Sequence, residues 1–222
     1  MTQNNNKFTE WASSLSGCNG GNPNAEIWVC GIESGLKNDN SEGYYSGELL
    51  NQVSKGAFIP SEKYDWKSHT TYKYGISMAK LYSAIKGRNV ECYKELENES
   101  ENNQIFQLNL YPIAFNSTKS DLWKQHKMHE FTGFEEKNLF KTWCFLHRFP
   151  KISKMVSKEN YSPKLIIGTG INYITDFFAC FAGTSGIDAK IHIGEIPASE
   201  NNKKKRNYYH PNPNIGEFLD CQ

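Results

Sequence analysis

Arginine is scarce in this sequence, and the positive and negative charges nearly cancel. Only three of the 25 basic residues are arginines, and the net charge is +1. A chain so close to neutral has no global field that attracts nucleic acid, so a local basic patch must hold any such partner.

Long apolar runs are also missing. No segment reaches the roughly 18 apolar residues that span a bilayer. The first residues, MTQNNNKF, lack the apolar stretch of a signal peptide. We therefore expect a cytoplasmic protein without a membrane partner.

The six cysteines include no Cys-x-x-Cys pair. This absence argues against a four-cysteine zinc or iron–sulfur site, and buried free thiols are the simplest interpretation. A zinc site from His126, His129, Cys144 and His147 has possible spacings, but a helical pattern already explains the second pair. The segment GTGINY lacks the lysine of a phosphate-binding loop. We therefore predict no metal and no cofactor.

The composition, with 38% hydrophobic and 14% aromatic residues, indicates a folded chain. A length of 222 residues suits one domain, 1–222, with a core at about 25–215. Apolar runs predict strands at 26–32, 105–111 and 163–170. Helical spacing alternates with them at 75–86, at 134–149 (ending before Pro150) and after Gly170.

This alternation predicts an α/β domain with a short, mainly parallel central sheet flanked by helices. Two more strands are expected at 189–196 and 204–211, joined by a polar turn. The polar segments 36–74 and 113–133 are long for structureless loops, so they carry function or small local elements.

Polar side chains follow three of the predicted strands. Glu33 follows the first, Asn109 lies near the end of the second, and His210 closes the last. Sites in open parallel sheets form outside the carboxyl ends of the strands. We therefore expect the sheet to gather Glu33, Asn109 and His210 at one edge.

These motifs resemble those of the uracil-DNA glycosylase superfamily. The segment 31–35, GIESG, is similar to its Gly-x-(acid or Asn)-Pro-(Gly or Tyr) motif. The segment 109–112, NLYP, is similar to the Asn-x-x-Pro form of its single-strand-selective monofunctional branch, and 210–213, HPNP, to its His-Pro-x-Pro motif. Ser34 replaces the usual proline. Gly35 replaces the tyrosine that excludes thymine, so the resemblance does not imply narrow uracil specificity.

The resemblance implies a metal-independent DNA glycosylase that hydrolyses the N-glycosidic bond of a flipped uracil or another deaminated or modified base. Glu33 would position water and stabilise a sugar cation, and His210 would stabilise the leaving base. Asn109 would read the base edge. The motifs contain no lysine, which implies a monofunctional enzyme that leaves an abasic site.

Further residues are expected to bind the base and the DNA. The base would lie against Gly31 and Ile32 and stack on an aromatic ring, for which Tyr44, Tyr45 and Phe58 are the candidates. Lys204, Lys205 and Arg206 would contact phosphates, and Asn212 and Asn214 would enter the duplex.

Simpler interpretations remain open from the sequence. Glu33 also fits an ordinary solvated loop acid. Asn109 and His210 precede prolines, and they also fit residues that simply terminate strands. A protein of this fold could also bind DNA or a nucleotide without catalysis, or hydrolyse free nucleosides or nucleotides.

Overall fold

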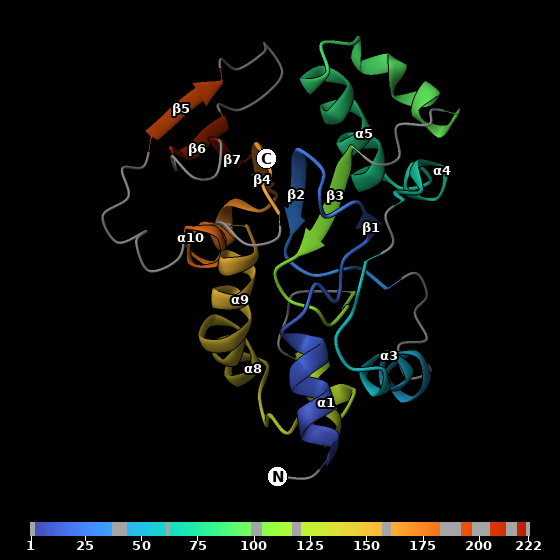
Figure 1. Ribbon diagram of the computed structural model, residues 1–222, viewed down its shortest axis with the longest axis vertical. Coiled ribbons are helices and arrows are strands. Elements are labelled where there is room, and N and C mark those ends of the chain that lie inside the picture. Colours follow the sequence, from blue (N-terminus) through green and yellow to red (C-terminus); the bar gives the residue numbers. More distant parts are fainter. Residues whose placement is uncertain are drawn as a thin grey trace.

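The strands form one mixed sheet in the computed structural model, in the order β1-β3-β2-β4-β7-β6-β5 (Figure 1). The structure describes residues 3–36, 44–60, 63–98, 104–116, 121–156, 161–182, 192–196, 205–211 and 217–220, the last three as backbone only. The strands are β1 (Gly20–Gly21), β2 (Ile27–Gly31), β3 (Ile105–Asn109), β4 (Leu165–Gly168), β5 (His192–Ile196), β6 (Lys205–Pro211) and β7 (Glu217–Asp220).

Helices connect and cover these strands. The α-helices are α1 (Gln3–Ala12), α3 (Leu50–Ser54), α4 (Trp66–His69), α5 (Lys73–Ile85), α6 (Asp121–Gln125), α7 (Met128–Thr132), α8 (Lys137–Trp143), α9 (Phe149–Lys154) and α10 (Ile174–Phe181). The π- and 3-10 segments are η1 (Tyr44–Leu49), η2 (Val90–Asn98), η3 (Cys144–Arg148) and η5 (Ile171–Tyr173). The small elements expected within 36–74 and 113–133 are therefore present.

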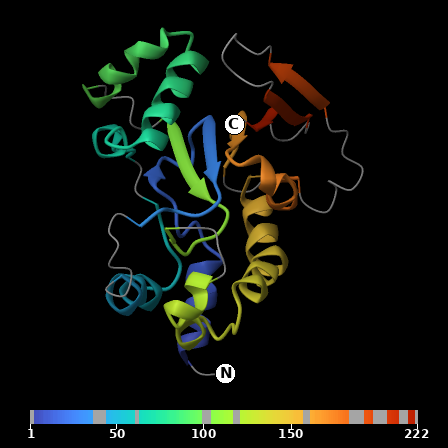
Figure 2. The same ribbon diagram turned by 180° about the vertical axis from the view of Figure 1, so that it is seen from behind.

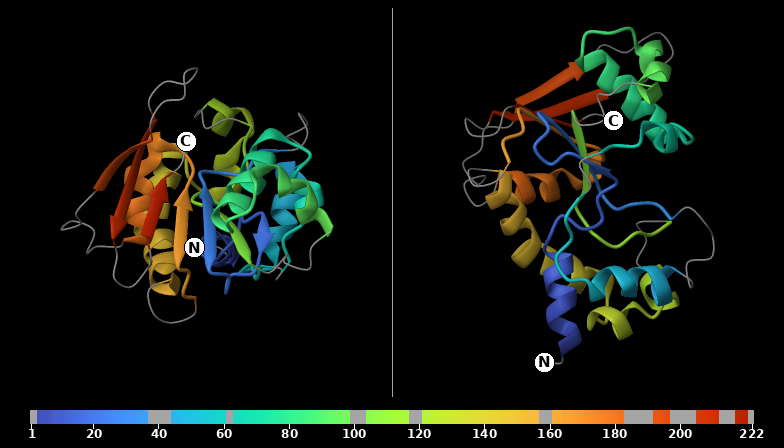
Figure 3. Two further views of the ribbon diagram at one scale, coloured as in Figure 1. Left: turned by 90° about the horizontal axis from the view of Figure 1, so that it is seen from above. Right: turned by 45° about the vertical axis from the view of Figure 1, so that its right-hand side comes forward.

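The prediction of an α/β domain is confirmed, but the sheet is less parallel than predicted. Only its centre, β3-β2-β4-β7, is parallel. Strand β1 pairs antiparallel with β3 at one edge, and β7, β6 and β5 pair antiparallel at the other. Seen from above in Figure 3, the β5–β6 hairpin, β4 and β2 stand in a row. The expected pair of strands near 189–196 and 204–211 is confirmed as this hairpin.

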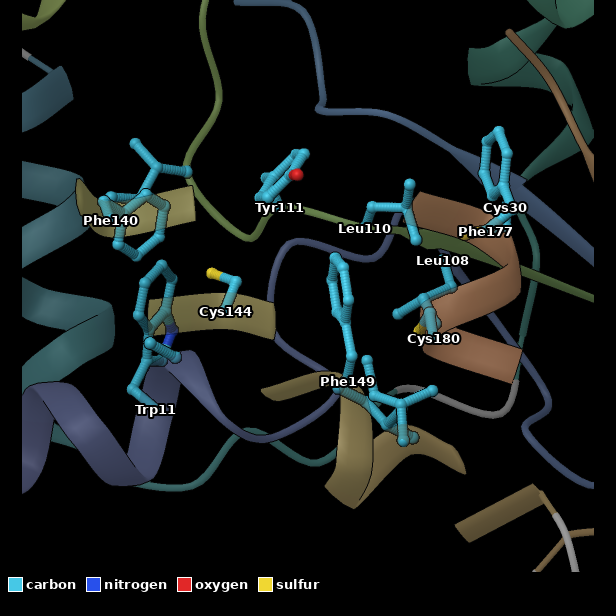
Figure 4. Close-up of a cluster of buried hydrophobic side chains, with 14 of the residues drawn as sticks. Trp11, Cys30, Leu108, Leu110, Tyr111, Phe140, Cys144, Phe149, Phe177 and Cys180 are labelled. Carbon is cyan, nitrogen blue, oxygen red and sulfur yellow. The ribbon is translucent and has the colours of Figure 1, made fainter. Parts of the chain in front are cut away.

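Both faces of the central strands are buried, which explains their continuous apolar runs. Trp28 and Cys30 of β2 belong to a core cluster with α1, η3 and α10, whereas Ile27 and Val29 pack with α5 and α4 on the other face. Figures 1 and 2 show the column of α8, α9 and α10 on one side of β2 and β3, and α5 on the other. Figure 4 shows the first cluster.

Two predicted helix ends have different outcomes. Gly87, with φ of 70°, ends α5 as expected, because this left-handed conformation suits glycine. The predicted end before Pro150 is wrong, since the helix continues through η3 into α9, where proline occupies the first turn. Proline lacks the N–H that would donate to an earlier carbonyl, and here the π-helical segment η3 immediately precedes α9.

Arg148 joins the N-terminal segment to the end of β3. The side chain is fully buried, and its guanidinium donates to five main-chain carbonyl oxygens. Two of these belong to Asn109 and Leu110, at 3.0 and 2.7 Å. The other three belong to the segment after α1, at Ala12, Ser14 and Ser16. This clamp fixes the backbone at the carboxyl end of β3.

None of the described helices is long and apolar enough to cross a bilayer.

Candidate active site at the carboxyl ends of β2 and β3

The first two sequence motifs lie side by side. Strands β2 and β3 are parallel neighbours in which Gly31 pairs with Asn109. The loops beyond them remain hydrogen-bonded: the Leu110 amide donates to the Gly31 carbonyl at 3.0 Å and the Tyr111 amide to the Ile32 carbonyl at 2.9 Å. The expectation that parallel strands bring Glu33 and Asn109 to the same sheet edge is confirmed.

Asn109 is a buried part of this edge. Its Nδ2 donates to the Gly17 carbonyl at 2.6 Å and to Ser34 Oγ at 2.7 Å. A Cβ at position 31 would lie 2.4 Å from Asn109 Oδ1, so a larger residue there would displace the Asn109 amide. The amide therefore holds the motif loops together, and both of its donor hydrogens are already used.

The edge lies where the strand order reverses. Strand β2 has β3 on one side and β4 on the other, and open parallel sheets place ligands at such a switch point. Ile32 packs on Gly170, whose φ of 138° favours glycine and where a Cβ would lie 2.4 Å from Ile32 Cδ1. On the α5 side, the Tyr74 hydroxyl lies 3.1 Å from Thr169 Oγ1.

Glu33 forms a buried ion pair with a residue outside the predicted motifs. Lys137, the first residue of α8, donates from Nζ to Glu33 Oε1 at 2.8 Å. The two side chains are 4% (Glu33) and 3% (Lys137) exposed. The second carboxylate oxygen, Oε2, is buried and has no hydrogen-bond partner among the described residues. Glu33 is therefore not a solvated loop acid.

Burial moves both members of the pair toward their neutral forms. Desolvation raises the pKa of Glu33, and the charge of Lys137 opposes that rise. Desolvation likewise lowers the pKa of Lys137, and Glu33 opposes it. Since the two shifts converge, transfer of the shared proton from nitrogen to oxygen costs less here than in water.

Aromatic rings and a small pocket surround Lys137. Its Nζ lies 4.2 Å from the centroid of the Phe115 ring. Lys137 also lines a pocket of about 160 Å³ with Asp121, Trp123, Lys124, Glu136 and Asn138. Drug-sized ligands fill pockets of roughly 300 Å³ or more, so this one suits a single sugar or base. Glu33 does not line it and connects to it through Lys137.

The prediction that His210 joins this edge is wrong. His210 pairs with Phe218 of β7, Phe218 pairs with Ile166 of β4, and Ile166 pairs with Trp28 of β2. His210 therefore lies at the same height in the sheet as Trp28. Trp28 is three residues before Gly31, which is about 10 Å along the strands, and β6 is three strands from β2, about 14 Å across the sheet. The prediction assumed a parallel last strand, whereas β6 is antiparallel to the central strands.

The predicted aromatic residues are not open stacking surfaces. Tyr45 is 2% exposed, donates to the Ala114 carbonyl at 2.9 Å, and packs against Phe115 and His126. Tyr44 is half-buried and lies edge-on to Tyr45. Phe58 is half-buried, and its backbone amide donates to Ser14 Oγ at 2.9 Å. A base could stack on Tyr45 only if its neighbours moved.

The predicted DNA-binding residues are described only in part. Lys205 and Arg206 begin β6, as backbone. Lys204, Asn212 and Asn214 lie outside the described residues. Their contact with phosphates stays a prediction.

Metal-ligating side chains are not gathered in the described segments, where no group of three or more His, Cys, Asp or Glu could hold a metal ion. Cys144 of the considered zinc set lies in the hydrophobic core, and burial raises the pKa of its thiol to about 12.

Lys137 is the functional candidate that the sequence did not reveal. It is 104 residues from Glu33 and is one of many lysines. The segment FEEKNLF marks a helix start, with nothing to distinguish this lysine from its neighbours.

Comparison with protein-family models, curated proteins and solved structures finds no match to this chain.

Proposed function

We propose that this protein hydrolyses the N-glycosidic bond of a flipped base in DNA, leaving an abasic site. The single observation that carries the proposal is the position of Glu33. It is an acid buried just beyond β2 at the switch point of the sheet, with one carboxylate oxygen lacking a partner among the described residues. A base of uracil type or another deaminated or modified base is the proposed substrate.

The proposed chemistry matches a buried carboxylate. Cleavage of the bond passes through a sugar with cationic character, which carboxylates stabilise in glycoside hydrolases. In a site of low dielectric constant, a negative oxygen stabilises that charge more strongly than it would in water. Lys137 must turn aside for Glu33 to face the sugar, because the pair is closed in this structure. Asn109 supports the loops, and reading of the base would use its Oδ1.

A second candidate is a module that binds DNA or a nucleotide without catalysis. One observation favours it: Glu33 Oε1 is held by Lys137, and the donors of Asn109 are held by Gly17 and Ser34. A site whose polar groups are already paired recognises its ligand only after those pairs open.

The two candidates are separated by turnover of Glu33→Gln. The wild-type protein and this variant are incubated with oligonucleotides that carry single uracil, hypoxanthine, xanthine, mismatched thymine or modified cytosine, single- and double-stranded. Hot alkali then reveals abasic sites. We expect wild-type cleavage on at least one lesion and a loss of about 100-fold or more in the variant, as for other acid–base groups.

Lys164→Met is the matched control, because Lys164 forms an exposed ion pair with Glu26. It should cleave like the wild type. Tight DNA binding without cleavage in the wild type would favour the binding module. Cleavage that survives Glu33→Gln would remove Glu33 from the mechanism.

A further inference from the structure

Lys137 has the surroundings of an amine nucleophile, although the sequence motifs contain no lysine. It lines the 160 Å³ pocket, its Nζ lies on the Phe115 ring, and its ammonium proton points to a carboxylate 2.8 Å away. An amine attacks carbonyl carbon only when neutral, and enzymes that form Schiff bases obtain a neutral lysine by desolvating it. The fold therefore supplies the residue whose absence predicted a monofunctional enzyme.

We propose that Lys137 forms a Schiff base with the aldehyde of an abasic sugar and cleaves the DNA strand there, so that the protein is also an abasic-site lyase. The inference rests on the proposed function in one respect, because the abasic sugar is the product of that reaction. Its chemistry is separate, since Lys137 acts on the aldehyde and not on the base.

The steps balance without an added reactant other than water. Glu33 Oε1 first accepts a proton from Lys137 Nζ, which leaves a neutral amine. The amine adds to C1′ of the open-chain sugar, and the carbonyl oxygen leaves as water with the proton from Glu33. A protonated imine and a Glu33 carboxylate result.

The carboxylate then removes a proton from C2′. The electron pair of that C–H bond forms the C2′–C3′ double bond, and the C3′–O bond breaks with its electrons on the departing phosphate. Water finally hydrolyses the imine, which restores the Lys137 amine and releases an unsaturated aldehyde. Glu33 thus serves as the proton carrier for Lys137.

The pocket fits this assignment better than it fits a duplex segment. It holds one sugar-sized group, and Lys137 is the member of the Glu33–Lys137 pair that lines it. The sugar aldehyde itself is uncharged, and only this group would enter the pocket. The phosphates on either side of it would lie outside, away from Asp121 and Glu136.

The test uses DNA that already contains an abasic site, so it does not depend on base release. The full-length protein is mixed with this DNA and sodium cyanoborohydride, which reduces an imine to a stable amine. We expect a covalent protein–DNA complex whose attached peptide contains Lys137. Without reductant, we expect strand cleavage that leaves a 3′ unsaturated aldehyde.

Three substitutions assign the nucleophile. Lys137→Arg keeps a cation beside Glu33 but cannot form the imine, and its trapping should fall to background. Lys141→Arg, one turn later on α8, should trap like the wild type. Lys164→Arg, at an exposed ion pair outside the pocket, should also trap like the wild type.

The outcomes separate the two proposals. Trapping that persists in Lys137→Arg, maps to Lys124, or never occurs overturns the lyase assignment, whatever the result with modified bases. Trapping on abasic DNA together with no base release would instead refute the proposed glycosylase and leave the lyase standing. A circular dichroism spectrum matching the wild type confirms that Lys137→Arg is folded.

Discussion

Lys137 and Arg148 are both buried cations, but their partners differ completely. Arg148 donates to five main-chain carbonyls of the segment after α1 and of the end of β3, and it uses both sides of its guanidinium. Lys137 donates to the Glu33 carboxylate, whose other oxygen has no partner among the described residues. Native proteins satisfy nearly all buried polar groups, so an incomplete pair calls for an explanation beyond stability.

The two cations also differ in whether their partners can take up a proton. Burial lowers the pKa of Arg148 too, but a guanidinium stays charged in proteins and the carbonyls around it cannot accept its proton, so the clamp has one state. Lys137 and Glu33 are joined by one hydrogen bond between two titratable groups, and burial shifts the pKa of each toward its neutral form. Buried ion pairs often add little stability, so this pair is weak evidence for a structural role and is compatible with the proposed function.

Loss of Arg148 should have the largest effect. Arg148→Met leaves five buried carbonyls without donors, and each unsatisfied group costs about 1–3 kcal/mol. We expect the free energy of unfolding to fall by more than about 4 kcal/mol, a large part of the stability of a typical domain. Urea denaturation followed by circular dichroism measures the loss.

Arg148→Lys is the matched control, because an ammonium has three donors in place of five. It should recover only part of the stability. A loss below about 1 kcal/mol in Arg148→Met would show that water replaces the guanidinium and that the clamp is not a scaffold.

Breaking the Glu33–Lys137 pair should cause the second-largest loss of stability, after the loss of Arg148. Lys137→Met leaves a buried carboxylate unpaired and should cost about 3 kcal/mol. The double variant Glu33→Gln, Lys137→Met removes both charges and should recover most of that loss. Urea denaturation of the two single variants and the double variant gives the coupling energy.

The exposed pair of Glu26 and Lys164 provides the comparison for this cycle. Surface pairs in high dielectric couple weakly, so the corresponding cycle should show no measurable coupling. If the two cycles gave the same result, the buried pair would be no different from a surface contact.

Local sequence patterns revealed one half of the site and not the other. Apolar runs located β2 and β3, and parallel pairing then placed Glu33 and Asn109 together, because the carboxyl ends of parallel strands coincide. The partners Lys137 and Arg148 contact residues 104 and up to 136 positions away. No local pattern encodes such contacts, so their roles appear only in the folded chain.

The direction of a strand is equally hidden from local patterns. The residues of β6 predicted a strand correctly, but the period of two is the same for parallel and antiparallel pairing. The short β7, only four residues long, supplies the fourth parallel strand and reverses the edge that His210 occupies. The resemblance in sequence motifs could not show this reversal.

A smaller effect is expected in the pH dependence of stability, through the titration of Glu33. The pKa of Glu33 is raised above 4.5 in the folded protein, so folding favours its protonated form. Stability from this group is present below pH 4.5 and lost as the pH rises through the raised pKa. The wild type should therefore gain stability over Glu33→Gln as the pH falls through that window. A thermal melting series measures the difference, and a constant difference would mean that Glu33 titrates normally.

The smallest effect is expected at His210. Its backbone is level with Trp28, whereas the reacting sugar is expected beyond Gly31, so a direct contact with the leaving base conflicts with the register. In the lesion assay, His210→Ala should lose far less turnover than Glu33→Gln. An equal loss would show that β6 reaches the site in the DNA complex, and it would restore the role that the His-Pro-x-Pro motif implied. The same variant also tests the comparison of Lys137 with Arg148. If His210 were catalytic, it could carry the proton that the comparison assigns to Glu33, and the Glu33–Lys137 pair would lose its distinct role.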